Sequence, residues 1–150
     1  MPQIHATAVS IKGNGIVLCG DSGAGKSDLG LRMIDRGARL VADDRCDLNM
    51  VDDQLIASCP QTIFGLMEVR GIGILRFECE GAAPVRLIVE LCDASDIERL
   101  PEQRMNKKYG IEIPTIRIAP FEASAATKII VALGHVLGED QGVARALDQL

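Results

Sequence analysis

The sequence predicts an α/β fold in which helices flank a mixed sheet, and three observations support this prediction. A short apolar run at 16–19 has the length of a buried strand. A glycine-rich loop at 20–27 follows it, and apolar residues at helical spacing come next. Further apolar runs bounded by turn residues lead to a second helical segment at 123–137. Strands and helices mixed in this order are typical of an α/β domain.

The elements of the first half follow from apolar runs and turn residues. The segment 12–15, Lys-Gly-Asn-Gly, tolerates positive φ and predicts a tight hairpin turn. Leu29, Met33 and Ile34 lie on one helical face, and Gly37 stands where a helix C-cap glycine belongs. The expected strands are 4–11, 16–19, 39–44, 46–51 and 55–59.

The second half is less regular. Residues 64–77 are mostly apolar, but glycines and charges interrupt them, a mixture that suits backbone close to a site better than a core. Residues 95–98, Ser-Asp-Ile-Glu, have the form of a capping box that opens a helical turn. We expect strands at 85–91 and 113–118 and a closing helix at 123–137, on which His135 is structural.

The composition limits the classes of partner. A chain of 150 residues is predicted to form one domain, 1–150. Its net charge of −5, with three Phe, one Tyr and no Trp, disfavours nucleic-acid binding, because such proteins present a basic face and stacking aromatics. We therefore expect no nucleic-acid partner, and we favour a basic protein as partner.

Cysteine usage and hydropathy indicate the compartment. The five cysteines are odd in number and include no C-x-x-C pair, so we expect neither a disulfide framework nor a zinc site. The first residues lack the basic start and apolar core of a signal peptide. No apolar run reaches the roughly 18 residues that span a membrane. We therefore expect a cytoplasmic protein that has no membrane partner.

The loop at 20–27 carries the strongest chemical signal. It matches every position of the phosphate-binding pattern, a glycine, four spacers and Gly-Lys-Ser. Its glycines let consecutive backbone N–H groups turn toward one point, Lys26 places a cation against the outer phosphates, and Ser27 can ligate Mg²⁺. We expect a nucleotide to be bound by Gly20, Asp21, Ser22, Gly23, Ala24, Gly25, Lys26 and Ser27. The alternative is a glycine-rich turn without a ligand.

Two carboxylates are the next candidates. Asp43 and Asp44 end a buried-type strand 17 and 18 residues beyond Lys26. Ligands of α/β sheets lie at the carboxyl ends of strands. One carboxylate there can bind Mg²⁺ through water, and its neighbour can act as a base for an attacking serine hydroxyl. The alternative is that both aspartates end the strand in solvent.

Four further residues give weaker signals by themselves. Glu68 can complete a metal shell and Arg70 can hold phosphate oxygens, or the two can form a cross-strand ion pair. His5, at a strand end, is by itself typical of a surface residue. Arg99 follows the capping box, where arginines are usually solvated.

Taken together, these residues resemble the catalytic domain of HPr kinase/phosphorylase. The resemblance covers about residues 4–118. Besides the general phosphate-binding loop, it depends on Leu-Val-Ala-Asp-Asp at 40–44 and Glu-Val-Arg-Gly-Ile-Gly-Ile at 68–74, which are specific to the family. His5, at 21 residues before Lys26, fits the same pattern.

The resemblance implies a core similar to that of phosphoenolpyruvate carboxykinase. It implies a kinase that uses ATP and Mg²⁺ to phosphorylate a serine of HPr, the phosphocarrier of the phosphotransferase system, with Arg99 or Arg70 steadying the transferred phosphoryl group. Family members assemble as hexamers, so we expect a homo-oligomer. The implied roles are active-site residues at His5 and Lys26, the acid/base at Asp44 with Asp43 as its helper, Mg²⁺ ligands at Ser27 and Glu68, and the catalytic arginine at Arg99.

The sequence departs from the family in three ways. His5 lies almost at the start of the chain, which resembles the short alphaproteobacterial form without the N-terminal domain. The C-terminal helices are short. Residues 119–124, Ala-Pro-Phe-Glu-Ala-Ser, replace a basic Pro-x-x-Pro-Gly-Arg segment linked to dephosphorylation. We therefore do not expect phosphorolysis.

Two other functions remain open from the sequence. A small-molecule kinase would use the same loop and the same pair of aspartates. A nucleotide-gated regulatory module without turnover would use the loop alone. A GTP switch is not predicted, because Asn-Lys-Lys-Tyr at 106–109 lacks the aspartate of a guanine-reading Asn-Lys-x-Asp motif.

Overall fold

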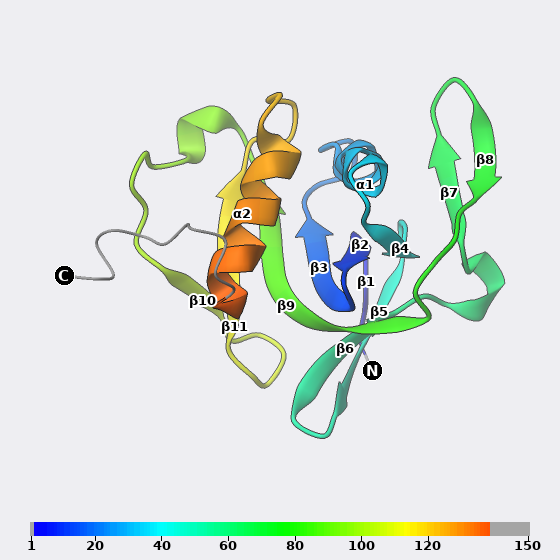
Figure 1. Cartoon of the computed structure of the whole chain (residues 1–150), viewed down its shortest axis with the longest axis horizontal. Coiled ribbons are helices and arrows are strands. Elements are labelled where there is room, and N and C mark those ends of the chain that lie inside the picture. The colour runs from blue at the N-terminus through cyan, green and yellow to red at the C-terminus, as the bar shows by residue number, and fades with distance from the viewer. Residues whose placement is uncertain (1, 139–150) are drawn as a thin grey trace.

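The computed structural model describes residues 2–138, and it confirms the predicted α/β fold. Two α-helices and a curled, mixed sheet make up most of this part of the chain (Figure 1). The strands are β1 (Gln3–Ile4), β2 (Ala6–Ile11), β3 (Asn14–Cys19), β4 (Arg39–Ala42), β5 (Cys46–Val51), β6 (Gln54–Ser58), β7 (Leu66–Val69), β8 (Gly73–Arg76), β9 (Ala82–Leu91), β10 (Arg104–Asn106) and β11 (Ile113–Ile118). The helices are α1 (Lys26–Asp35), α2 (Ala125–Leu137) and the 3₁₀ turns η1 (Gln61–Ile63) and η2 (Ala94–Asp96).

The long strand β9 organises the sheet. Its first residues pair with β6 in antiparallel fashion, and its later residues lie between β3 and β11, parallel to both. On the other side of β3 follow β2 and then β4, both antiparallel to their neighbours. The sheet curls because β9 bends from one set of partners to the other, as its sweep beneath β3 shows (Figure 1). The carboxyl ends of β3, β9 and β11 therefore meet at one edge.

Two apolar layers cover the two faces of this sheet. On one face, α1 and α2 bury Leu29, Met33 and Ile129 against apolar side chains of β3 and β9. On the other face, the curl of the sheet encloses a second cluster that includes Val17 and Leu48. Burial of such side chains stabilises by roughly 1.5–3 kcal/mol each, so the layers fix the register of β3 and with it the start of the loop at residue 20.

Helix α1 begins and ends where the sequence predicts. Gly25 lies before its first residue with φ 99°. At its other end Gly37 has φ 103°, its N–H donates to Ile34 O, and the next N–H, of Ala38, donates to Met33 O. These two bonds form a Schellman motif, which favours glycine because the left-handed φ carries no Cβ penalty.

Three local predictions need correction. The strand expected at 4–11 is broken at His5, which lies in a bend between β1 and β2. The strand expected at 39–44 ends at Ala42, because a turn begins at Asp43. The capping box at 95–98 does not form: the turn η2 ends at Asp96, and Ile97 is already extended.

Residues 64–77, singled out for their mixed character, contain an exposed hairpin. Strands β7 and β8 pair only with each other and stand apart from the main sheet (Figure 1). Met67 is buried near Gly30 of α1, whereas every residue of β8 is exposed. The hairpin therefore touches the helix that follows the phosphate-binding loop.

All five cysteines are free thiols. Burial raises the pKa of Cys46 to about 12 and that of Cys59 to about 11, so both stay neutral near pH 7. None of the helices within residues 2–138 is long and apolar enough to cross a membrane.

We predict that Gly15→Ala destabilises the protein by about 1–3 kcal/mol, because overpacking strains a filled site. Gly15 is buried in β3, and a Cβ there would lie 2.8 Å from the carbonyl oxygen of Pro84 in β9. Gly81→Ala is the matched control, since no atom lies within 4 Å of its added Cβ, and it should change stability by less than about 0.5 kcal/mol. Urea denaturation measures both, and equal effects would contradict the prediction.

Candidate functional site

The loop at 20–27 lies between the carboxyl end of β3 and the start of α1 (Figure 1). Gly23 and Gly25 have φ of 81° and 99°, which L side chains rarely adopt. No atom lies within 4 Å of a Cβ added at Gly23, so its backbone is open to solvent. Alternating left-handed glycines before a helix N-terminus form an amide-lined concavity that suits an anion.

Lys26, the first residue of α1, folds back over this loop. Its Nζ donates to Gly20 O at 2.6 Å and to Asp21 O at 2.9 Å. The two carbonyls hold the ammonium across the loop, where it adds a full positive charge to the helix N-terminus. The ammonium is therefore already positioned beside the concavity that the glycines open.

Asp43 is buried beside the loop and accepts two hydroxyl hydrogen bonds. The residue as a whole is 8% exposed. Ser27 Oγ donates to Asp43 Oδ1 at 2.7 Å, and Thr7 Oγ1 donates to the same oxygen at 2.8 Å. Asp43 thus does not end the strand in solvent, which was the alternative left open by the sequence.

Asp44 is exposed to solvent, in contrast to the buried Asp43. A tight turn, in which Arg45 N–H donates to Asp43 O at 2.8 Å, places Asp44 at φ 70° with its side chain 74% exposed. Strained φ of this kind clusters at functional sites. His5 Nδ1 lies 3.8 Å from Asp44 Oδ1, because the bend between β1 and β2 faces the turn between β4 and β5.

The residues present fit a Mg²⁺-bound nucleotide. The open backbone at Gly23, the Lys26 ammonium and the helix N-terminus offer donors and positive charge to phosphates. The paired oxygens of Ser27 and Asp43 are hard donors of the kind that Mg²⁺ prefers.

Glu68 and Arg70 are not joined to this group. Glu68 is exposed on β7 opposite Ile74, and Arg70 is exposed where the hairpin turns. Neither forms an ion pair with another residue of the described range 2–138, so the cross-strand pair considered from the sequence is absent there. Within that range no three His, Cys, Asp or Glu side chains are arranged to hold a metal. The Mg²⁺ role of Glu68 stays a prediction.

Arg99 is not joined to the loop either. It is exposed in the irregular segment between η2 and β10, and the structure gives its side chain no hydrogen bond or ion pair within residues 2–138. The preceding turn, η2, is attached to the sheet through Arg117, whose Nη1 donates to Asp96 O at 3.4 Å. The catalytic role of Arg99 therefore stays a prediction from the resemblance.

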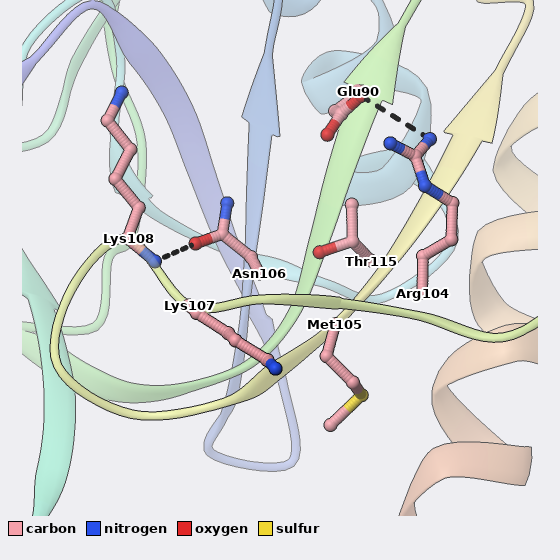
Figure 2. Close-up of a pocket in the computed structure, with 7 residues that line it drawn as sticks. All are labelled: Glu90, Arg104, Met105, Asn106, Lys107, Lys108 and Thr115. Atoms are coloured by element: carbon pink, nitrogen blue, oxygen red, sulfur yellow. Dashed lines mark hydrogen bonds and ion pairs between the residues drawn. The ribbon is translucent and has the colours of Figure 1, made fainter.

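A separate hollow of about 240 Å³ lies where β9, β10 and β11 meet (Figure 2). Lys26, Asp43 and Asp44 do not line it. Two cations of the hollow are partly neutralised by carboxylates. Arg104 Nη1 lies 4.0 Å from Glu90 Oε2, and Lys107 Nζ lies 3.5 Å from Glu112 Oε1. The predicted site is instead the open surface around the loop. The hollow is lined by Glu90, Arg104, Met105, Asn106, Lys107, Lys108 and Thr115.

The sequence analysis missed three residues beside the loop. Thr7 is buried in β2 and binds Asp43, and its only sequence signal is a hydroxyl within an apolar strand. Arg32 of α1 donates to the carbonyls of Pro120 and Glu122. Phe121, between them, lies against Gly25. The contacts of Arg32 and Phe121 join segments about 90 residues apart, which no local pattern reveals.

Comparison with known proteins identifies the family of the chain. The sequence profile of the HPr Serine kinase C-terminal domain matches residues 1–146. The chain belongs to this family. A solved structure of the Hpr(Ser) kinase/phosphatase from Coxiella burnetii is similar to this HPr serine kinase C-terminal domain at 30% identity, with a TM-score of 0.79 and 92% of each chain covered. The likeness of the core to phosphoenolpyruvate carboxykinase is consistent with the family.

Curated relatives of this HPr serine kinase domain carry the name HPr kinase/phosphorylase. The protein of Lactiplantibacillus plantarum is 37% identical over 86% of this chain and 44% of its own length. That of Prosthecochloris aestuarii is 35% identical over 98% of this chain and 48% of its own length. The chain thus spans about half the length of the curated relatives that it matches.

We predict that Thr7→Val lowers the free energy of unfolding by about 1.5–3 kcal/mol, the usual value for a hydrogen bond to a charged group. The substitution keeps the side-chain shape but removes a donor to the buried Asp43 carboxylate. Thr115→Val is the control: its buried hydroxyl donates to the neutral carbonyl of Ile113 at 3.2 Å, so the loss should be about 0.5–1.5 kcal/mol. Urea denaturation compares the two, and a larger loss at Thr115 would contradict the prediction.

Proposed function

We propose that this chain is a protein-serine kinase domain, residues 1–150, which uses ATP and Mg²⁺ to phosphorylate a serine of HPr. The observation that carries the proposal is one cluster at the carboxyl edge of the sheet: the Lys26 ammonium over an open glycine loop, the Ser27–Asp43 pair, and an exposed Asp44 beside His5. The names of the relatives support HPr as the substrate.

The loop and Lys26 would bind and orient the phosphates. ATP bound with Mg²⁺ supplies an activated terminal phosphoryl group. The amide-lined loop and the ammonium neutralise its charge, and positioning of this kind supplies most of the catalysis in phosphoryl transfer. Ser27 and Asp43 would hold Mg²⁺, because their oxygens already lie 2.7 Å apart and Asp43 is fixed by Thr7.

Asp44 would act as the general base. In this step the serine oxygen of HPr forms a bond to the terminal phosphorus, the bond from that phosphorus to the ADP oxygen breaks, and the hydroxyl proton passes to Asp44. Its 74% exposure leaves the carboxylate accessible to a protein substrate, which the buried Asp43 is not. His5, at 3.8 Å, would orient Asp44.

The roles predicted for three further residues belong to the same proposal. Glu68 would complete the Mg²⁺ shell, and Arg70 or Arg99 would steady the transferred phosphoryl group; all three are exposed and would reach the site when the substrates are bound. We place the enzyme in the cytoplasm as a homo-oligomer, a hexamer by family resemblance, with a regulatory role in the phosphotransferase system.

We predict that Asp44→Asn lowers the rate of phosphoryl transfer from labelled ATP to HPr by about 10²–10⁴-fold, because a general base contributes that much. ATP binding should be unchanged, because Asp44 is not part of the loop. Asp52→Asn is the control: Asp52 is also an exposed aspartate with positive φ, 49°, and it lies in the hairpin between β5 and β6.

Other outcomes of this assay discriminate among the functions. Labelling that persists in Asp44→Asn would reject Asp44 as the base. ATP consumption without protein labelling would favour a small-molecule kinase. ATP binding without turnover would favour a regulatory module, and loss of binding in Lys26→Ala would show that the loop is the site in each case.

We predict that the domain does not catalyse phosphorolysis. In the segment 119–124, Glu122 stands where the family has basic residues, and its carboxylate pairs with Lys128 at 3.3 Å. An acid offers no counter-charge to an attacking inorganic phosphate. Serine-phosphorylated HPr incubated with phosphate should release no pyrophosphate, and its release at a rate comparable to the forward reaction would contradict the prediction.

A further inference from the structure

Phe121 is an exposed aromatic at the phosphate-binding loop. The chain has three Phe, one Tyr and no Trp, so aromatic rings are scarce. Phe121 is nevertheless 73% exposed. A single exposed apolar side chain is common on protein surfaces, so the position of this ring is its informative property.

The ring lies directly against the loop. Phe121 follows β11 and precedes α2, and a Cβ added at Gly25 would lie 2.9 Å from Phe121 Cζ and 3.1 Å from Cε1. Gly25 is the last glycine before Lys26. The ring therefore forms part of the rim of the phosphate-binding loop, not a remote surface patch.

The backbone on both sides of the ring is clamped to α1. Arg32 donates through Nη2 to Pro120 O and through Nη1 to Glu122 O at 3.3 Å. Asp28, one turn earlier on α1, fixes the same guanidinium through Nε at 3.1 Å. The backbone that carries the exposed ring is thus fixed to α1, so little backbone conformational entropy is lost when a ligand stacks on the ring.

The sheet places the ring on the opposite side of the loop from the acids. The strand before the loop, β3, has β2 and β4 on one side, and Asp43 and Asp44 follow β4. On its other side lie β9 and then β11, which leads to Phe121. A nucleotide whose terminal phosphate points toward Asp44 has its base at the other end of the phosphate chain. The base therefore leaves the loop on the side of Phe121.

We propose that Phe121 is the platform on which the nucleotide base stacks. The inference rests on the proposed function, since it takes the loop to bind ATP. Stacking on a phenyl ring is tolerant of base identity because every base has a π face. The platform would therefore hold adenine and guanine alike, and it would make no contact with inorganic tripolyphosphate.

The first test uses the absence of Trp from the sequence. Phe121→Trp keeps an aromatic face and introduces a single indole at the loop. Its fluorescence should be quenched by ATP and by GTP in the presence of Mg²⁺, and tripolyphosphate should leave it nearly unchanged. Equal changes with tripolyphosphate would show that the indole senses phosphate binding and not a base, which would overturn the proposal.

The second test measures affinity by calorimetry. Phe121→Ala should raise the Kd for ATP by roughly 5- to 150-fold, the range for removal of one base–aromatic stack, and leave the Kd for tripolyphosphate unchanged. Phe121→Tyr should retain the affinity for ATP. Met50→Ala is the control, because Met50 is 45% exposed on β5, away from the loop, and should alter neither Kd.

The outcomes separate the two proposals. Tripolyphosphate and ATP that both fail to bind the natural protein would overturn the proposed function and the platform with it. Binding of both ligands with an unchanged ATP Kd in Phe121→Ala would overturn the platform alone. An increase only in the KM for HPr would also overturn it, since the ring would then contact the protein substrate.

Discussion

The carboxylate of Asp43 ties together the three elements that build the site. It accepts hydrogen bonds from Ser27 in the first turn of α1 and from Thr7 in β2, and its own backbone follows β4. A buried carboxylate is tolerated when it is hydrogen-bonded, and these two donors meet that need. Gly30 lets α1 approach this closely, because a Cβ there would lie 2.8 Å from Thr7 Cγ2. The start of α1, and hence the loop, is thereby fixed to the sheet.

The turn that follows Asp43 gives two identical side chains different environments. Asp43 is 8% exposed, while the left-handed backbone of Asp44 directs a side chain that is 74% exposed toward His5. Neighbouring carboxylates in unlike environments are suited to different tasks, as in other pairs of acids. The topology of the sheet adds the second asymmetry, since the acids follow β4 and the clamped ring follows β11, on opposite sides of β3.

Local sequence signals predicted most elements of the fold. The loop, the helix α1 that is followed by Gly37, the closing helix of the described chain and the hairpin turn at 12–15 all depend on residues close in sequence. The failures have tertiary causes. His5 breaks its strand because β1 pairs with β5 while β2 pairs with β3 and β4. A 3₁₀ turn forms in place of the capping box expected at 95–98. Arg117 of β11 donates to the carbonyl of Asp96 at the end of this turn.

The sequence by itself identified the glycine-rich loop at 20–27 as the candidate phosphate-binding element, because glycine conformation, the lysine charge and the serine hydroxyl act within eight consecutive residues. It also identified Asp43 and Asp44 as a pair of candidate site carboxylates. Only the tertiary structure decided which of the two is buried, since that depends on the hydroxyl of Thr7, 36 residues away. It likewise decided that Phe121 lies at the loop, because Arg32 must cross from α1 to bind the backbone beside it. Contacts between distant segments follow from the packing of the sheet, and no local pattern encodes them.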